Sequence, residues 1–207
     1  MPDINELKRL SQSLAMLDAI IEPDWQYRFY SFNAHWSQEA TMASMRDGSG
    51  DSYFILFNDV GAIIKGFAHE CAMSPYRVNP PTLWPEVMDA VPAEFSDFLR
   101  ELAFVIADAT FCLWRRHADS EWQRGAIDFP NGADPDGSAA LLAILDGNPK
   151  TYQTWAQEYY ERDLDLTSIA QIYRHQLLSQ EIIESLNADL SLVDVMEDAA
   201  EIGYPTA

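Results

Sequence analysis

The chain has 207 residues and a formal net charge of −20, because 33 acidic residues outnumber 13 basic ones. Apolar residues make up 48% of it, which is enough to bury a core and argues against disorder. The charge opposes contact with phosphates and anionic lipid head groups, so we expect no nucleic-acid or membrane binding, and it favours a basic protein partner.

Residues 4–21 predict an amphipathic helix, since apolar side chains recur every three or four positions. Asp3 can cap its first turn, and Pro23 ends it. Residues 27–32 alternate with a period of two and carry several aromatic side chains, which is typical of a strand.

Three short strands are predicted next, at 41–46, 52–57 and 62–67. The turn sequence DGSGD (47–51) separates the first two, and Asn58-Asp59 followed by Gly61 separates the second pair. These turns fix an antiparallel meander, and such a sheet needs cover on one face. We expect the N-terminal helix to supply that cover.

The remaining chain reads as helices around one further strand and two irregular stretches. Short helices are expected at 84–90 and 93–102. Residues 104–114 are ambiguous, although FCLW (111–114) is typical of a strand, and further helices are expected at 140–145 and at about 149–161, 166–174, 179–186 and 191–202. The Gly-, Pro- and Asp-rich stretch 119–137 is the one plausible boundary. The sequence thus predicts an α+β domain over 1–130 and a helical extension over 131–207 packed on it, or one continuous domain. In fold class, this is an N-terminal helix, a central antiparallel meander sheet with helices on one face, and a C-terminal all-helical extension.

Signatures of catalysis and cofactor binding are missing from the sequence. The four histidines lie far apart, and no G-x-S-x-G, G-x-G-x-x-G or Walker pattern occurs. His69, Glu70 and Cys71 are potential metal ligands, but successive residues of an extended chain point to opposite faces. We therefore expect no enzyme, no cofactor and no metal.

Cysteine usage and the N-terminal residues favour a cytoplasmic protein. Cys71 and Cys112 form no CxxC pair, and two cysteines make no disulfide framework in a chain that can bury a core. The first residues are acidic and lack the apolar run of a secretory signal. No segment approaches the roughly 18 apolar residues of a membrane span.

Partner binding has two sets of candidate residues. One set of carboxylates is spaced for a single helix face that could receive Lys or Arg, with a solvated outer face as the alternative. These are Asp194, Glu197, Asp198 and Glu201. Trp84 and Trp122 lie among Pro, Glu and Gly, and a partly exposed Trp is a common anchor of binding hot spots.

An alternative hypothesis is a small-ligand binder or enzyme with a pocket between the sheet and the helical tail. Strand ends and loops would line that pocket. The candidates are Arg28, Trp36, Arg46, His69 and Glu70. A third hypothesis is an oligomerisation unit, which would show a large exposed apolar patch.

The segment GSGDSYFILFNDVGAIIKGFAHE (48–70) resembles a signature of the SUKH superfamily, which includes fungal cell-wall synthesis regulators. In that family a Gly-Asp turn enters an apolar strand, and the strand after the next turn ends near His-Glu. VPAEFSDFLREL (91–102) resembles the family's closing helix, so the match covers about residues 45–102. EPDWQYRFYSFN (22–33) departs from the family pattern, and the residues after 103 have no counterpart in it.

The resemblance implies an α+β fold with a central antiparallel sheet, protein binding, and no catalytic residues. Many bacterial members are immunity proteins that neutralise secreted nuclease toxins, whose surfaces are basic. The expected function is therefore that of a non-catalytic, acidic protein-binding module, an immunity protein that masks a basic partner such as a nuclease toxin.

Overall fold

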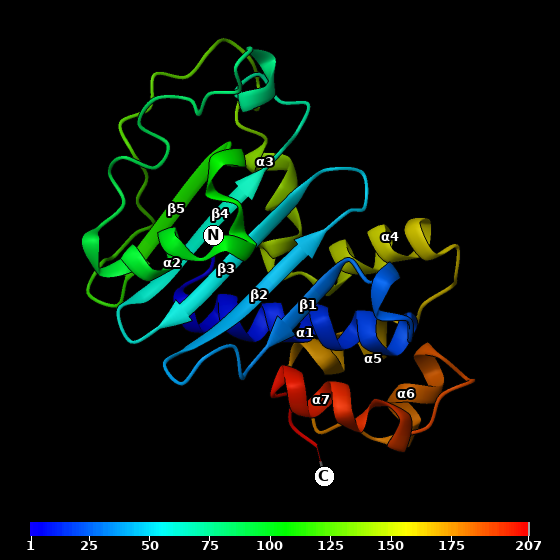
Figure 1. Ribbon diagram of the computed structural model, residues 1–207. Helices are drawn as coiled ribbons and strands as arrows, with labels where there is room; N and C mark the ends of the chain where they lie inside the picture. Colours follow the sequence, from blue (N-terminus) through cyan, green and yellow to red (C-terminus); the bar gives the residue numbers. More distant parts are fainter. Residues whose placement is uncertain (207) are drawn as a thin grey trace. The chain divides into compact units, whose positions relative to one another are not determined.

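A computed structural model describes residues 1–206 (Figure 1). The predicted α+β class is confirmed, with a helix at the N-terminal end, an antiparallel meander and a helical C-terminal region. The chain divides into two units, one formed by Met1–Trp36 with Ile144–Ala207 and the other by Ser37–Ala143. The N-terminal helix thus belongs to the same unit as the C-terminal helices.

The first unit is built around α1 (Ile4–Ile21), which begins with a capping box between Asp3 and Glu6. Every residue from Ser13 to Ile21 is buried, so the second half of α1 is a core helix. It contacts β1, α5, α6 and α7. The other elements of this unit are η1 (Trp25–Tyr27), β1 (Tyr30–Asn33), α4 (Pro149–Tyr160), α5 (Leu166–Tyr173), α6 (Gln180–Leu186), η7 (Val193–Val195) and α7 (Met196–Ile202).

The second unit contains four strands that pair antiparallel in chain order. They are β2 (Ala40–Arg46), β3 (Ser52–Asn58), β4 (Gly61–Phe67) and β5 (Phe111–Arg116). The first turn is held by Asp47, whose Oδ1 accepts hydrogen bonds from the backbone N–H groups of Ser49, Gly50 and Asp51. The Asn58 side chain holds the second turn in the same way. The turn residues therefore fix the register, as predicted.

One face of this sheet is covered by the segment that carries α2 (Ser96–Arg100), which crosses in front of the strands in Figure 1. The Phe104 ring lies 4.6 Å from that of Phe98 and 5.0 Å from that of Phe54 on β3. Short turns and one short helix complete the unit. They are η2 (Pro75–Arg77), η3 (Ala93–Phe95), η4 (Leu102–Phe104), η5 (Ile106–Asp108) and α3 (Ser138–Leu141), followed at the unit boundary by η6 (Ala143–Asp146).

Two local expectations differ from the structure. Residues 85–90 form turns and no helix, because Pro85 disfavours a helical backbone at the preceding Trp84 and Glu86 adopts a positive φ of 65°. The aromatic strand begins later than expected, since Trp25–Tyr27 form a 3-10 turn and β1 starts at Tyr30. No helix of residues 1–206 is long and apolar enough to cross a membrane.

Candidate functional site

The predicted acidic helix exists as η7 followed by α7, and its four carboxylates differ in environment. Glu197 and Glu201 are exposed and lie one helical turn apart. Asp194 is exposed, but its Oδ2 accepts hydrogen bonds from the Ser191 hydroxyl at 2.6 Å and the Ser191 N–H at 2.8 Å. These bonds lower the pKa of Asp194 and keep it ionised. Asp198 is half-buried and has a basic partner.

That partner is Arg28, which was predicted for a different site. Its Nη1 and Nη2 donate to the two Asp198 carboxylate oxygens at 2.6 and 3.1 Å. Its Nε and Nη2 also donate to the carbonyls of Glu22 and Pro23, both at 2.8 Å. The Arg28 side chain is only 8% exposed. Arg28 therefore fastens the segment after α1 to α7.

A small pocket opens beside this ion pair within the first unit. Trp25, Arg28, Asp198 and Glu201 line it, with apolar atoms from α1, β1 and α7 behind them. Its volume of about 20 Å³ has room for roughly one water molecule. A metabolite does not fit inside a pocket of this size. A side chain of a protein partner could lie across its mouth.

Two large aromatic side chains stand exposed at the same place in the chain. Trp25 is 56% exposed and Tyr27 is 59% exposed, both on η1. The Asp24 carboxylate caps the turn by accepting from the Gln26 N–H and side-chain amide. We call the set Trp25, Tyr27, Glu197, Asp198 and Glu201 the acidic–aromatic surface.

Sequence reasoning missed Trp25 and Tyr27. Trp25 was not among the predicted partner-binding residues, and Tyr27 was assigned to a strand. The signal was present in EPDWQYR (22–28), where a Pro-Asp pair precedes Trp25 and polar residues alternate with the aromatics. That pattern is typical of a capped turn at the surface.

Trp84 and Trp122, the predicted aromatic anchors, belong to the second unit and are half-buried. The Trp84 Nε1 donates a hydrogen bond of 3.1 Å to the Asp128 carbonyl. Trp122 lies next to Gln123, whose backbone pairs with Trp114 at the end of β5. Both residues are therefore less exposed than Trp25.

The residues of the predicted ligand pocket are divided between the units. Arg28 and Trp36 belong to the first, whereas Arg46, His69 and Glu70 belong to the second. Arg46 is exposed at the end of β2, and Trp36 is half-buried. His69 and Glu70 approach each other, with His69 Nε2 at 3.8 Å from Glu70 Oε1.

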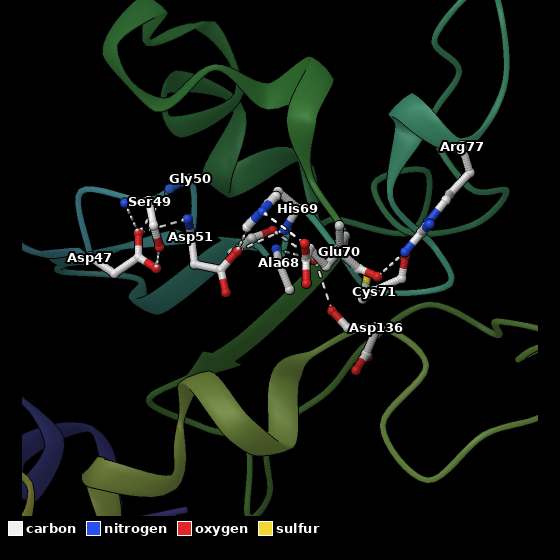
Figure 2. Close-up of polar contacts among 12 residues, drawn as sticks. Asp47, Ser49, Gly50, Asp51, Ala68, His69, Glu70, Cys71, Arg77 and Asp136 are labelled. Atoms are coloured by element: carbon white, nitrogen blue, oxygen red, sulfur yellow. Dashed lines mark hydrogen bonds and ion pairs between the residues drawn. The ribbon is translucent and has the colours of Figure 1, made fainter.

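His69 has a defined partner, Asp51, at the base of the first hairpin (Figure 2). Asp51 Oδ1 accepts from His69 Nδ1 at 2.7 Å and from the His69 backbone N–H at 2.8 Å. The hydrogen bond that His69 donates to Asp51 raises the pKa of His69. Gly50 leaves room for the ring, since a Cβ there would lie 3.0 Å from Nδ1 and its φ is +131°. The neutral imidazole thus carries its proton on Nδ1 and leaves Nε2 as the base.

The surroundings of this pair offer little further chemistry. Arg77 donates to the carbonyls of Glu70 and Cys71, which shapes the turn after His69 (Figure 2). Burial raises the pKa of the Cys71 thiol, which disfavours the nucleophilic thiolate. Across residues 1–206, no group of three or more His, Cys, Asp or Glu side chains could hold a metal ion.

Comparison of the chain with protein-family models, with curated proteins and with solved structures gave no match in any of the three. The resemblance to the SUKH superfamily rests on residues 45–102 alone and stays a prediction.

Proposed function

We propose that this protein is a non-catalytic protein-binding module whose acidic–aromatic surface receives a basic protein partner. The observation that carries the proposal is the exposed Trp25 ring, which shares a pocket with the carboxylates of Asp198 and Glu201. Exposed Trp and Tyr are the side chains most often found at the centre of binding hot spots. A cationic side chain of a partner can contact the Trp25 ring and a carboxylate at once.

The charge distribution supports a basic partner. Arg28 neutralises Asp198, but no basic side chain within residues 1–206 pairs with Glu197 or Glu201. The whole chain carries a net charge of −20, which would attract a basic protein over a long range and speed their encounter. A complex formed in this way weakens as the salt concentration rises.

The resemblance to SUKH proteins suggests which basic partner this is. We propose a cytoplasmic immunity protein that masks the basic surface of a nuclease toxin. The acidic composition supports the idea, because a nuclease surface that binds phosphates is basic and prefers acidic inhibitors.

The test is calorimetric titration at low salt with a basic nuclease toxin, taken from the neighbouring genes if one of them encodes such a toxin. We expect a complex whose affinity falls at least tenfold in Trp25→Ala and in Glu201→Lys. Trp122→Ala is the matched control in the second unit and should bind as the wild type does. No complex at low salt contradicts the proposal, as does a complex weakened by Trp122→Ala and unaffected by Trp25→Ala.

A second candidate function is small-ligand binding or catalysis at His69. The Asp51–His69 pair favours it, because a carboxylate that holds Nδ1 prepares Nε2 to act as a general base. Nuclease protection separates the two candidates. If the acidic–aromatic surface acts, the wild type protects and Asp51→Asn leaves protection intact, whereas a small-ligand binder or catalyst at His69 gives no protection even in the wild type.

A further inference from the structure

Lys65 lies in the middle of β4 and is only 1% exposed. It is one of three lysines, the others being Lys8 and Lys150. Its neighbours across the sheet are Phe54 on β3 and Cys112 on β5. A lysine at a central sheet position is uncommon, because its ammonium group loses water on burial.

The environment of the amine is apolar and aromatic. The Nζ atom lies 5.7 Å from the centroid of the Phe67 ring, and the Phe54 ring packs against Phe104. In the part of the chain that the structure describes, nothing accepts a hydrogen bond from Nζ and no carboxylate forms an ion pair with it. Burial lowers the pKa of Lys65 to about 8, although Asp108 partly opposes the shift. A substantial fraction of Lys65 is therefore a neutral amine near pH 8.

The segment 101–108, which we call the strap, packs against this face of the sheet. It consists of η4 and η5, and its residue Val105 adopts a left-handed φ of 43°, which is strained for a β-branched side chain. Leu102 is 89% exposed and Val105 is 50% exposed, whereas Phe104 is buried. At its far end the Tyr76 hydroxyl donates to Asp108 at 2.8 Å. A segment with so few buried anchors opens at low free-energy cost.

We propose that Lys65 is a reactive amine that captures a small aromatic aldehyde as an imine when the strap opens. The neutral amine attacks the carbonyl carbon, a C=N bond replaces the C=O bond, and the oxygen leaves as water with both amine protons. No oxidant or reductant takes part. Nucleophilic lysines are typically desolvated among apolar groups, as Lys65 is. The surrounding aromatic side chains suit an aromatic ligand and exclude the water that would hydrolyse the imine.

The experiment traps the imine in the intact native protein. Benzaldehyde and cyanoborohydride are added at pH 7.5, and the benzylated lysines are located by peptide mass mapping. We expect Lys65 to react at least fivefold faster than the exposed Lys150, and Lys65→Met to lose that adduct alone. Reaction at Lys8 and Lys150 with Lys65 unmodified overturns the proposal.

Two strap variants show whether access occurs through this segment. Phe104→Ala removes the buried anchor and should raise the rate at Lys65 several-fold while leaving Lys150 unchanged. Leu102→Ala alters an exposed side chain of the same strap and should leave both rates unchanged. Modification of Lys65 that appears only in denaturant, or an equal rate in both variants, contradicts the proposal.

Discussion

The Tyr152 hydroxyl donates a hydrogen bond of 2.8 Å to Asp18 Oδ1, across 134 positions of the chain. The other carboxylate oxygen accepts from the backbone N–H groups of Phe29 and Tyr30, both at 2.8 Å. The Asp18 side chain is fully buried. One carboxylate thus joins α1, α4 and the segment that leads into β1, and it fixes the chain just after Trp25 and Tyr27.

The free energy of unfolding should depend on pH through the titration of Asp18. Burial raises the pKa of Asp18 from 3.8 to about 6, so the folded state keeps a proton that the unfolded chain releases earlier. The free energy of unfolding therefore falls as the pH rises through about 6, by about 3 kcal/mol from this residue. Asp18→Asn retains an acceptor and has no proton to lose. Urea unfolding between pH 4 and 7 should show wild type losing stability relative to this variant, and parallel curves would contradict the prediction.

Lys65 should destabilise the fold at neutral pH. Burial lowers the pKa of Lys65 from 10.5 to about 8, so the folded state holds fewer protons than the unfolded chain between these values. Stability contributed by this residue therefore rises with pH from about 8 to 10.5. Lys65→Met should raise the free energy of unfolding at pH 7 by about 3 kcal/mol, and its advantage should shrink toward pH 10. Lys150→Met, at an exposed lysine, serves as the control. A Lys65→Met variant less stable than the wild type at pH 7 would count against the prediction.

The Arg28–Asp198 ion pair should couple measurably, since it is bidentate and Arg28 is nearly buried. A double-mutant cycle with Arg28→Ala and Asp198→Ala should give a coupling free energy of about 1–2 kcal/mol in urea unfolding. The exposed pair Arg100–Asp97 is the matched control, with an expected coupling near zero. Equal coupling in the two pairs would show that Arg28 does not fasten α7.

The Asp51–His69 hydrogen bond should be visible in the titration of the imidazole. Asp51 raises the pKa of His69, so Asp51→Asn should lower that pKa toward its ordinary value. NMR titration of the His69 ring protons measures the change, and the distant His117 serves as an internal reference. An unchanged His69 pKa in Asp51→Asn would mean that the hydrogen bond does not form in solution.

The elements predicted well are those with local causes. The first helix follows from apolar residues at helical spacing and the Asp3 cap, and both turns of the meander follow from Asp47 and Asn58. Residues 84–90 were predicted as helical from their side chains, but Pro85 restricts the backbone of Trp84 and the positive φ of Glu86 is incompatible with a helix.

The candidate site was predicted only in part, because its decisive contacts are not local. Helical spacing predicts that the acidic residues of α7 share a face. The pairing of Asp198 with Arg28 spans 170 positions, and no sequence pattern predicts it. The exposure of Trp25 depends on which side of a 3-10 turn faces solvent. The burial of Lys65 is also unexpected, because the residues around it in the sequence do not distinguish it from a surface lysine.

The most direct test of the proposed binding surface is hydrogen–deuterium exchange of the protein alone and in complex with its basic partner. The proposal predicts that the strongest added protection covers residues 22–29 and 193–202, which carry the acidic–aromatic surface. Protection confined to residues 47–51 and 67–77, or to the segments around Trp84 and Trp122, with exchange at 22–29 unchanged, would contradict it.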